Sequence, residues 1–173
     1  HRLRAIKPSQ FFGSRREELH RRLLQELSHQ IDPSDYDCRS VIPNFFLEAR
    51  GNDVPVFVAT RKAWYAGALA ARGMHALQSY GQGGSIYDNN AYTIAATYTG
   101  DHLRLYTTHV VDPKIRIDRL DRIDRPKYIT TQLGGWSLTG SLASLRKGVL
   151  AYRNARDWAK EKRMELIEGA KAR

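Results

Sequence analysis

Apolar and polar residues follow one another along this chain in patterns that predict a mixture of helices and strands. Ser14 and Glu17 have the spacing of a helix-capping pair, and leucines recur after them at helical spacing. We therefore predict a first helix over residues 15–29. Residues 31–40 contain an Asp-Pro-Ser-Asp sequence and are predicted to form a loop.

The next two apolar segments are predicted to be strands. An aromatic run over residues 45–50 has the pattern of a buried strand, and the glycine-containing segment 51–53 is predicted to be a turn. Residues 54–58 form a shorter apolar run whose proline indicates a strand start or an edge strand.

A second helix and a hairpin are predicted in the middle of the chain. Residues 61–80 are rich in alanine and end at a glycine-rich loop over 81–85. Residues 92–98 and 103–111 flank a turn that contains glycine, which predicts a β-hairpin. The densely charged segment 112–127 is predicted to be an exposed loop or a short solvated strand.

The last predicted element is a long C-terminal helix over residues 141–169. Its apolar residues are expected to form one packed stripe, made of Leu142, Leu145, Val149, Tyr152, Ala155, Ala159 and Met164. The order helix, strand, strand, helix, hairpin, helix predicts an α/β (α+β) fold, in which helices flank a mixed central sheet. At 173 residues, the chain is expected to form a single domain over residues 1–173.

Charge is the compositional feature that points to a partner. The formal net charge is +10, which favours an anionic partner: nucleic acid first, then an acidic membrane surface or an acidic protein. Cys38 is the only cysteine, so an internal disulfide and a zinc site built on cysteine pairs are excluded. The sequence shows no membrane span and no signal peptide, so we expect an intracellular protein, nuclear or cytoplasmic. Because the chain does not begin with methionine, it can also be part of a longer protein.

Glu48 and Arg50 form the candidate site. They lie two residues apart at the end of the predicted strand 45–50, so their side chains project from the same face. A metal-dependent nuclease needs a carboxylate that holds a divalent cation and a cation beside it that stabilises the phosphate. A solvated strand edge or a surface ion pair would show the same two residues.

Four motifs resemble a group of the PD-(D/E)xK nuclease-like superfamily that is associated with filamentous fungi. They are Lys7-Pro8-Ser9-Gln10-Phe11, Pro43-Asn44-Phe45-Phe46-Leu47-Glu48-Ala49-Arg50-Gly51, Gly73-Met74-His75-Ala76-Leu77-Gln78-Ser79-Tyr80-Gly81 and Tyr152-Arg153-Asn154-Ala155-Arg156-Asp157-Trp158-Ala159-Lys160. The resemblance implies a restriction-endonuclease-like sheet between helices, with metal ligands on the central strands. It also implies nucleic acid as the partner and Mg²⁺ or Mn²⁺ as the cofactor.

The chain departs from the group's pattern at two of three site positions. Gln10 stands where an aspartate is expected, and Arg50 stands where a lysine is expected. Glutamine is a weaker ligand for Mg²⁺, and arginine can clamp phosphate but serves poorly as a general base. We therefore expect a degenerate, inactive site in which any metal is absent or weakly bound at Glu48. Asp32, Asp35 or Asp37 remain possible replacement ligands.

The remaining candidates are basic, polar and aromatic residues outside the Glu-x-Arg pair. Gln78 corresponds in the resemblance to a glutamine that supports the metal site, although a packing role is equally compatible. The cationic residues that we expect to contact nucleic acid are Arg61, Lys62, Arg72, Arg146, Lys147 and Arg153. The residues that could stack on bases or pack in the core are Tyr92, Tyr98 and Tyr106, and the segment 88–90 is either a metal-ligand loop or a turn.

Three functions remain open from the sequence. The first is a nucleic-acid-binding domain of nuclease-like fold with an inactive metal site. The second is an active Mg²⁺- or Mn²⁺-dependent nuclease with an altered site, and the third is a protein-interaction module on the same scaffold. The sequence leaves open whether the partner is DNA or RNA, whether binding is sequence-specific and whether the chain forms oligomers.

Overall fold

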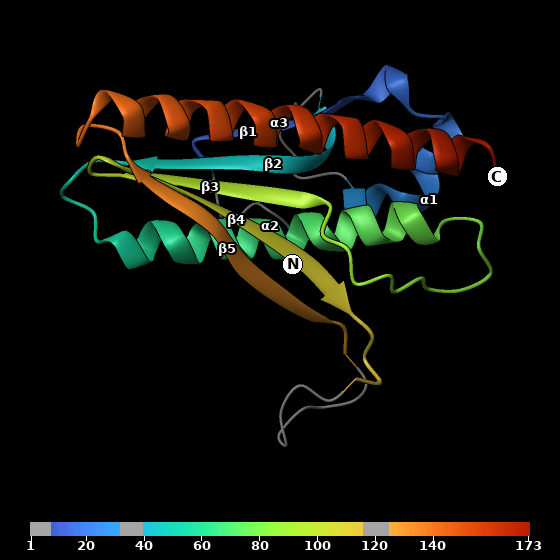
Figure 1. The fold of residues 1–173 in the computed structure, drawn as a ribbon. Helices are drawn as coiled ribbons and strands as arrows, with labels where there is room; N and C mark the ends of the chain where they lie inside the picture. The colour runs from blue at the N-terminus through green and yellow to red at the C-terminus, as the bar shows by residue number, and fades with distance from the viewer. Residues whose placement is uncertain (1–7, 32–39, 116–124) are drawn as a thin grey trace.

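The fold is a mixed five-stranded sheet between helices (Figure 1). The computed structural model describes residues 8–31, 40–115 and 125–173. Its strands are β1 (Gln10–Arg15), β2 (Ser40–Arg50), β3 (Thr93–Thr99), β4 (His102–Val111) and β5 (Lys127–Ser137). Its helices are α1 (Arg21–Ile31), α2 (Val56–Ser79) and α3 (Leu142–Lys171), with a 3-10 turn, η2, at Arg16–Glu18. The predicted α+β class, with a mixed sheet and a long C-terminal helix, is confirmed.

The strands lie in the order β1-β2-β3-β4-β5. The pair β2 and β3 is parallel, and α2 is the crossover helix that a parallel pair requires. The other three pairs are antiparallel, and β3 with β4 forms the predicted hairpin. β2 therefore lies inside the sheet, next to the β1 edge.

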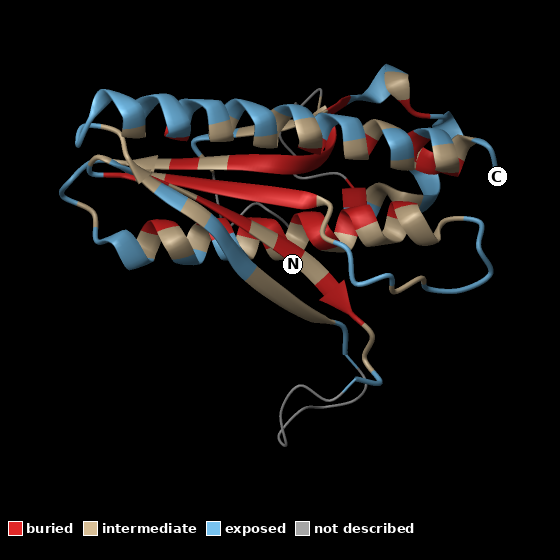
Figure 2. Ribbon diagram, in the orientation of Figure 1, coloured by how far each residue is buried: buried red, intermediate tan, exposed pale blue. Residues whose placement is uncertain are grey.

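The two faces of the sheet are covered by different helices. On β2, Phe45 packs in a cluster with Ala159 of α3, whereas Phe46 packs against Ala66 and Ala70 of α2. Successive side chains of a strand point to opposite faces, so consecutive aromatic residues can fill both layers. Figure 2 shows the result: β2 and β3 are largely buried, whereas the outer surfaces of α2 and α3 are exposed or half-buried.

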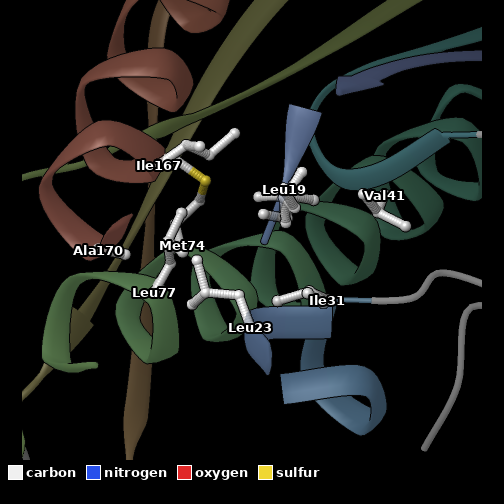
Figure 3. Packing of buried hydrophobic residues seen from close by; sticks show 9 residues of the cluster. Leu19, Leu23, Ile31, Val41, Met74, Leu77, Ile167 and Ala170 are labelled. Atoms are coloured by element: carbon white, nitrogen blue, oxygen red, sulfur yellow. The ribbon is translucent and has the colours of Figure 1, made fainter. Parts of the chain in front are cut away.

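A third cluster closes one end of the sandwich. Leu23 and Ile31 of α1 meet Met74 and Leu77 of α2 and Ile167 of α3, and all five side chains are buried (Figure 3). The three helices are thus held together by side chains far apart in the sequence. The amphipathic leucines of the first helix, which the sequence predicts, bury their apolar face here.

The N-terminal prediction is wrong at its boundary. The helix begins at Arg21 rather than at residue 15, because residues 10–15 form β1 and cover the aromatic edge of β2. Ser14 is buried on β1 and accepts a hydrogen bond from Arg163 Nε at 3.0 Å. The backbone N–H of Arg15 donates to Glu18 Oε2 at 3.1 Å instead. Ser14 therefore takes part in strand pairing and does not cap the helix as predicted.

The strand predicted over residues 54–58 is also wrong. Val56, Phe57 and Val58 form the first turn of α2, which begins five residues before the predicted helix start at residue 61. Pro55 directly precedes the helix, where a fixed φ is favourable and a missing N–H costs no hydrogen bond. Pro55 therefore marks the start of a helix and not the start of a strand.

Two features near the C-terminus differ from expectation. β5 was not predicted, because it carries threonines and two glycines instead of an apolar run and lies at an open sheet edge. The helix stripe is packed only in part: Leu142 is 62% exposed and Val149 is 44% exposed. None of the helices in the described part of the chain is long and apolar enough to cross a membrane.

Candidate functional site

Glu48 lies near the end of β2, on the sheet face that α2 covers. Phe46, two residues earlier, packs against α2, and strand alternation places Glu48 on the same side. The carboxylate is 2% exposed, which is unusual for glutamate unless the charge is paired. The strand and helix together therefore bury one acid between the sheet and α2.

Two cations converge on a single oxygen of this carboxylate. Arg50 lies with Nε and Nη2 both 2.5 Å from Glu48 Oε1. Lys62, from the first half of α2, lies with Nζ 3.5 Å from the same oxygen. Both cations remain about one-third exposed, at 32% and 33%. The cluster thus carries two positive charges against one negative charge and opens to solvent through its cations.

Four buried polar atoms near this cluster lack a hydrogen-bond partner among the described residues. Glu48 pairs in register with Thr97, and Thr97 pairs with Arg104, so the three side chains share the α2 face of the sheet. Across the described residues, Glu48 Oε2, Thr97 Oγ1, Thr99 Oγ1 and Arg104 Nη1 are buried without a hydrogen-bond partner. Buried polar groups are normally paired, so this concentration marks a place where water or a ligand group is expected.

Gln10 does not join Glu48. It pairs in register with Leu47, whose side chain lies in the cluster on the α3 face. Gln10 is therefore on the opposite side of the sheet from Glu48, because a shift of one residue reverses the face. Ser9, the preceding residue, is held beside the end of β2, where its hydroxyl donates to Ala49 O at 3.1 Å and accepts from Ala49 N at 2.9 Å.

Gln78 is also remote from Glu48. It lies in the last turn of α2, about 24 Å along the helix axis from Lys62 at 1.5 Å per residue. Its Nε2 donates to Asp88 Oδ2 at 2.7 Å. This position fits the packing role that the sequence also allows for Gln78. It does not allow Gln78 to support the Glu48 site.

The described residues do not fit a divalent metal at Glu48. Mg²⁺ and Mn²⁺ require several oxygen ligands, but here one carboxylate has one of its oxygens covered by cations. No group of three or more His, Cys, Asp or Glu side chains that could hold a metal occurs in residues 8–31, 40–115 and 125–173. Asp32, Asp35 and Asp37, the possible replacement ligands, lie outside the described residues.

The predicted cationic residues are divided among three regions. Arg61 and Lys62 lie in the first half of α2, and Lys62 reaches the carboxylate that Arg50 also contacts. Arg72 lies further along α2, where it lines an open groove of about 540 Å³ together with Tyr87 and Tyr128. The third set lies on the exposed surface of α3, across the sheet from Glu48, and comprises Arg146, Lys147 and Arg153.

Tyr92, Tyr98 and Tyr106, which were candidates for base stacking, make contacts within the fold instead. Tyr98 packs in the cluster on the α3 face, and Tyr106 is 4% exposed. The Tyr92 hydroxyl donates to Asp88 Oδ2 at 2.5 Å. Within residues 8–31, 40–115 and 125–173, the large exposed aromatic side chains are instead Phe57 and Trp64 of α2, at 61% and 46%. Their shared face could have been found from the sequence if residues 56–58 had been assigned to the helix.

Asp88 anchors the loop that follows α2 through hydrogen bonds. It accepts hydrogen bonds from Tyr92, Gln78 and the backbone and side chain of Asn90, and Asn89 takes a positive φ of 58°. Burial alone would raise the pKa of Asp88, but these hydrogen bonds outweigh it and hold the pKa below the usual carboxyl value. Burial and the Asp88 bond raise the pKa of Tyr92 to about 12. These contacts fit a turn at residues 88–90, which is one of the two structures predicted for this segment.

Comparison of the chain with known protein families, with curated protein sequences and with solved structures gives no significant match. The four motifs and the geometry around Glu48 are therefore the features of the chain that bear on its function.

Proposed function

We propose that this protein is a nucleic-acid-binding domain of nuclease-like fold whose metal site is closed, so that it binds without cleaving. The observation that carries the proposal is the arrangement around Glu48. Arg50 and Lys62 both approach Oε1, in the place where a nuclease-like site would hold its cation.

The charge balance of this cluster favours an anion over a cation. One carboxylate faces two cations, and Arg61 extends the positive surface along α2. The chain as a whole carries a formal charge of +10, which raises the local concentration of a polyanion. A phosphate group can approach the exposed parts of Arg50 and Lys62, and guanidinium groups bind phosphate with paired hydrogen bonds.

Cleavage is not expected from these residues. Arg50 cannot activate water as a general base, because a guanidinium group does not serve as a base in proteins. Its permanent charge beside Glu48 also opposes the entry of a divalent cation. No catalytic step through a metal follows from this donor set.

Binding at increasing salt concentration tests the proposal. For about three phosphate contacts to a single strand, affinity should fall about 20-fold between about 50 and about 200 mM salt. Lys62→Gln should weaken binding, and Glu48→Gln should strengthen it by up to about tenfold, which corresponds to about 1.4 kcal/mol. Lys160→Gln, exposed on α3 across the sheet from Glu48 and outside the predicted binding residues, is the matched charge control. Binding that does not respond to salt, or no binding at low salt, would instead support the interaction module.

A cleavage assay separates the proposal from an active nuclease. We expect no Mg²⁺- or Mn²⁺-dependent cleavage of plasmid or RNA by the unmodified protein. Restoration can be attempted in Arg50→Lys by adding Ser9→Asp, with Gln10→Asp as the control on the opposite face. Cleavage by the unmodified protein that is lost in Glu48→Ala would contradict the closed site and implicate an aspartate from residues 32–37.

A further inference from the structure

The first half of α2 presents an exposed aromatic stripe that the core does not use. Phe57 and Trp64 are 61% and 46% exposed, and Arg61 lies between them. Residues at spacings of three, four and seven lie on one face of a helix, so the three side chains form a stripe about 10 Å long. Large exposed apolar side chains grouped in this way indicate a binding surface.

Trp64 is held in a fixed orientation. Its ring meets that of Tyr106 edge-on, with the centroids 6.3 Å apart and the planes at 82°. Tyr106 is itself 4% exposed and paired within the sheet, so it supports the indole from below. The exposed part of the indole is thus an ordered platform, which lowers the entropy cost of stacking a partner on it.

The charge around the stripe favours a polyanion over an apolar protein surface. The 24-residue helix α2 contains no aspartate or glutamate. Arg61 lies within the stripe, and Lys62, the next residue, reaches the Glu48–Arg50 pair. Arg61 therefore lies within the aromatic stripe, whereas Lys62 turns from the same part of the helix toward β2.

From this juxtaposition we infer that the first half of α2 binds single-stranded nucleic acid. Phe57 and Trp64 stack on unpaired bases, while Arg50, Arg61 and Lys62 contact phosphates. A duplex keeps its base faces covered by neighbouring base pairs, so only unpaired bases can stack in this way. The inference rests on the proposed nucleic-acid binding and adds the strandedness of the partner.

Fluorescence anisotropy with labelled oligothymidylate, oligouridylate and a hairpin duplex tests the inference. Each aromatic-to-alanine change, Phe57→Ala or Trp64→Ala, should weaken single-strand binding about 5- to 150-fold. Duplex binding should change by less than about twofold, because it depends on the cations alone. Leu150→Ala, on α3, is the matched control for loss of an exposed apolar side chain, and it should leave all three affinities unchanged.

A conservative variant guards against a folding artefact. Trp64→Phe retains a ring that can stack, so single-strand binding should recover, while quenching of tryptophan fluorescence by the oligonucleotide should be lost. Trp136 and Trp158 remain as internal reporters of folding.

The outcomes separate this inference from the function on which it rests. Equal binding of single strands and duplex, with no effect of Phe57→Ala or Trp64→Ala, would overturn the single-strand inference and leave nucleic-acid binding intact. Failure of all three probes to bind at low salt would overturn both. Selective loss of single-strand binding in the two alanine variants, with recovery in Trp64→Phe, would support the inference.

Discussion

β2 carries two buried polar clusters, one on each face of the sheet, and they differ in how completely their hydrogen bonds are made. On the α3 face, Asn44 Nδ2 donates to Tyr92 O at 2.9 Å and to Ala159 O at 2.7 Å, and its Oδ1 accepts from Arg163. Arg163 also donates to Ser14 Oγ. On the α2 face, Glu48 has one oxygen held by cations and one oxygen without a partner in the described residues.

The difference separates a structural cluster from a candidate site. Asn44 is fully buried, and each side-chain atom that can form a hydrogen bond does so, which fixes β1, β2 and α3 to one another. Thr97, beside Glu48, is equally buried with its hydroxyl unpaired. An unpaired buried group lowers stability, so its persistence is expected where a ligand or water completes it.

The largest effect is expected from Asn44→Ala. The change removes the donor to two backbone carbonyls and the acceptor of Arg163, and it leaves a small cavity. We expect the free energy of unfolding to fall by about 3 kcal/mol, measured by urea denaturation. Asn154→Ala, exposed on α3, is the control and should change it by less than about 0.5 kcal/mol. A loss below about 1 kcal/mol for Asn44→Ala would show that Asn44 does not hold β1, β2 and α3 together.

Arg50→Met should have the next largest effect. It leaves the buried Glu48 carboxylate with Lys62 at 3.5 Å as its cation. We expect a loss of about 2 kcal/mol in the free energy of unfolding, because a buried charge has lost its hydrogen-bonded partner. Arg50→Lys should recover about half of this loss. Equal stability of both variants and the unmodified protein would show that the pair is not closed in solution.

Two threonines of β3 provide the sharpest test of the comparison. Thr93 and Thr97 are both fully buried, but Thr93 Oγ1 donates to Thr108 O at 3.0 Å, whereas Thr97 Oγ1 is unpaired. Thr93→Val should cost about 1 kcal/mol in thermal or urea unfolding. Thr97→Val should cost clearly less than Thr93→Val, because the Thr97 hydroxyl has no protein partner among the described residues. Equal losses for the two variants would mean that Thr97 has a solvent partner.

The smallest effect concerns His75, near the other end of α2, whose Nε2 is buried and meets no hydrogen-bond partner in the part of the chain that the structure describes. Burial lowers the pKa of His75 below its ordinary value of 6.5, against an opposing backbone hydrogen bond to Ile86 and the charge of Asp88. The unfolded chain therefore takes up the proton at higher pH than the folded protein. Its contribution to stability is present above the unfolded pKa and is lost as pH falls through the folded pKa.

Unfolding of the unmodified protein and His75→Gln at about pH 7.5 and about pH 5.5 measures this contribution. The unmodified protein should lose more stability than the variant on acidification, because burial lowers the pKa of His75 in the folded state. An identical loss in both proteins would show that His75 titrates equally in the folded and unfolded states.

Periodicity alone was enough for the elements whose patterns are strong and local. The aromatic run of β2, the hairpin of β3 and β4 and the long helix α3 all lie close to their predicted positions. The shared face of Glu48 and Arg50 also follows from the alternation of a strand, and their contact confirms it. These features depend on neighbours within a few residues.

Features that depend on pairing between distant segments required the tertiary structure. The face of Gln10 is set by its register with Leu47, and a shift of one residue would have reversed it. The exposed face shared by Phe57 and Trp64 depends on where α2 begins, and a proline can mark either a helix start or a strand start.

The chain by itself thus determined a mixed fold, a positive charge and a Glu-x-Arg pair on one strand face. Only the tertiary structure decided that Lys62 completes the closure of Glu48 and that Gln78 lies elsewhere. The physical reason is that helical and strand periods fix which way a side chain points relative to its neighbours. Which distant side chain it meets is decided by the register of the sheet and the packing of the helices upon it.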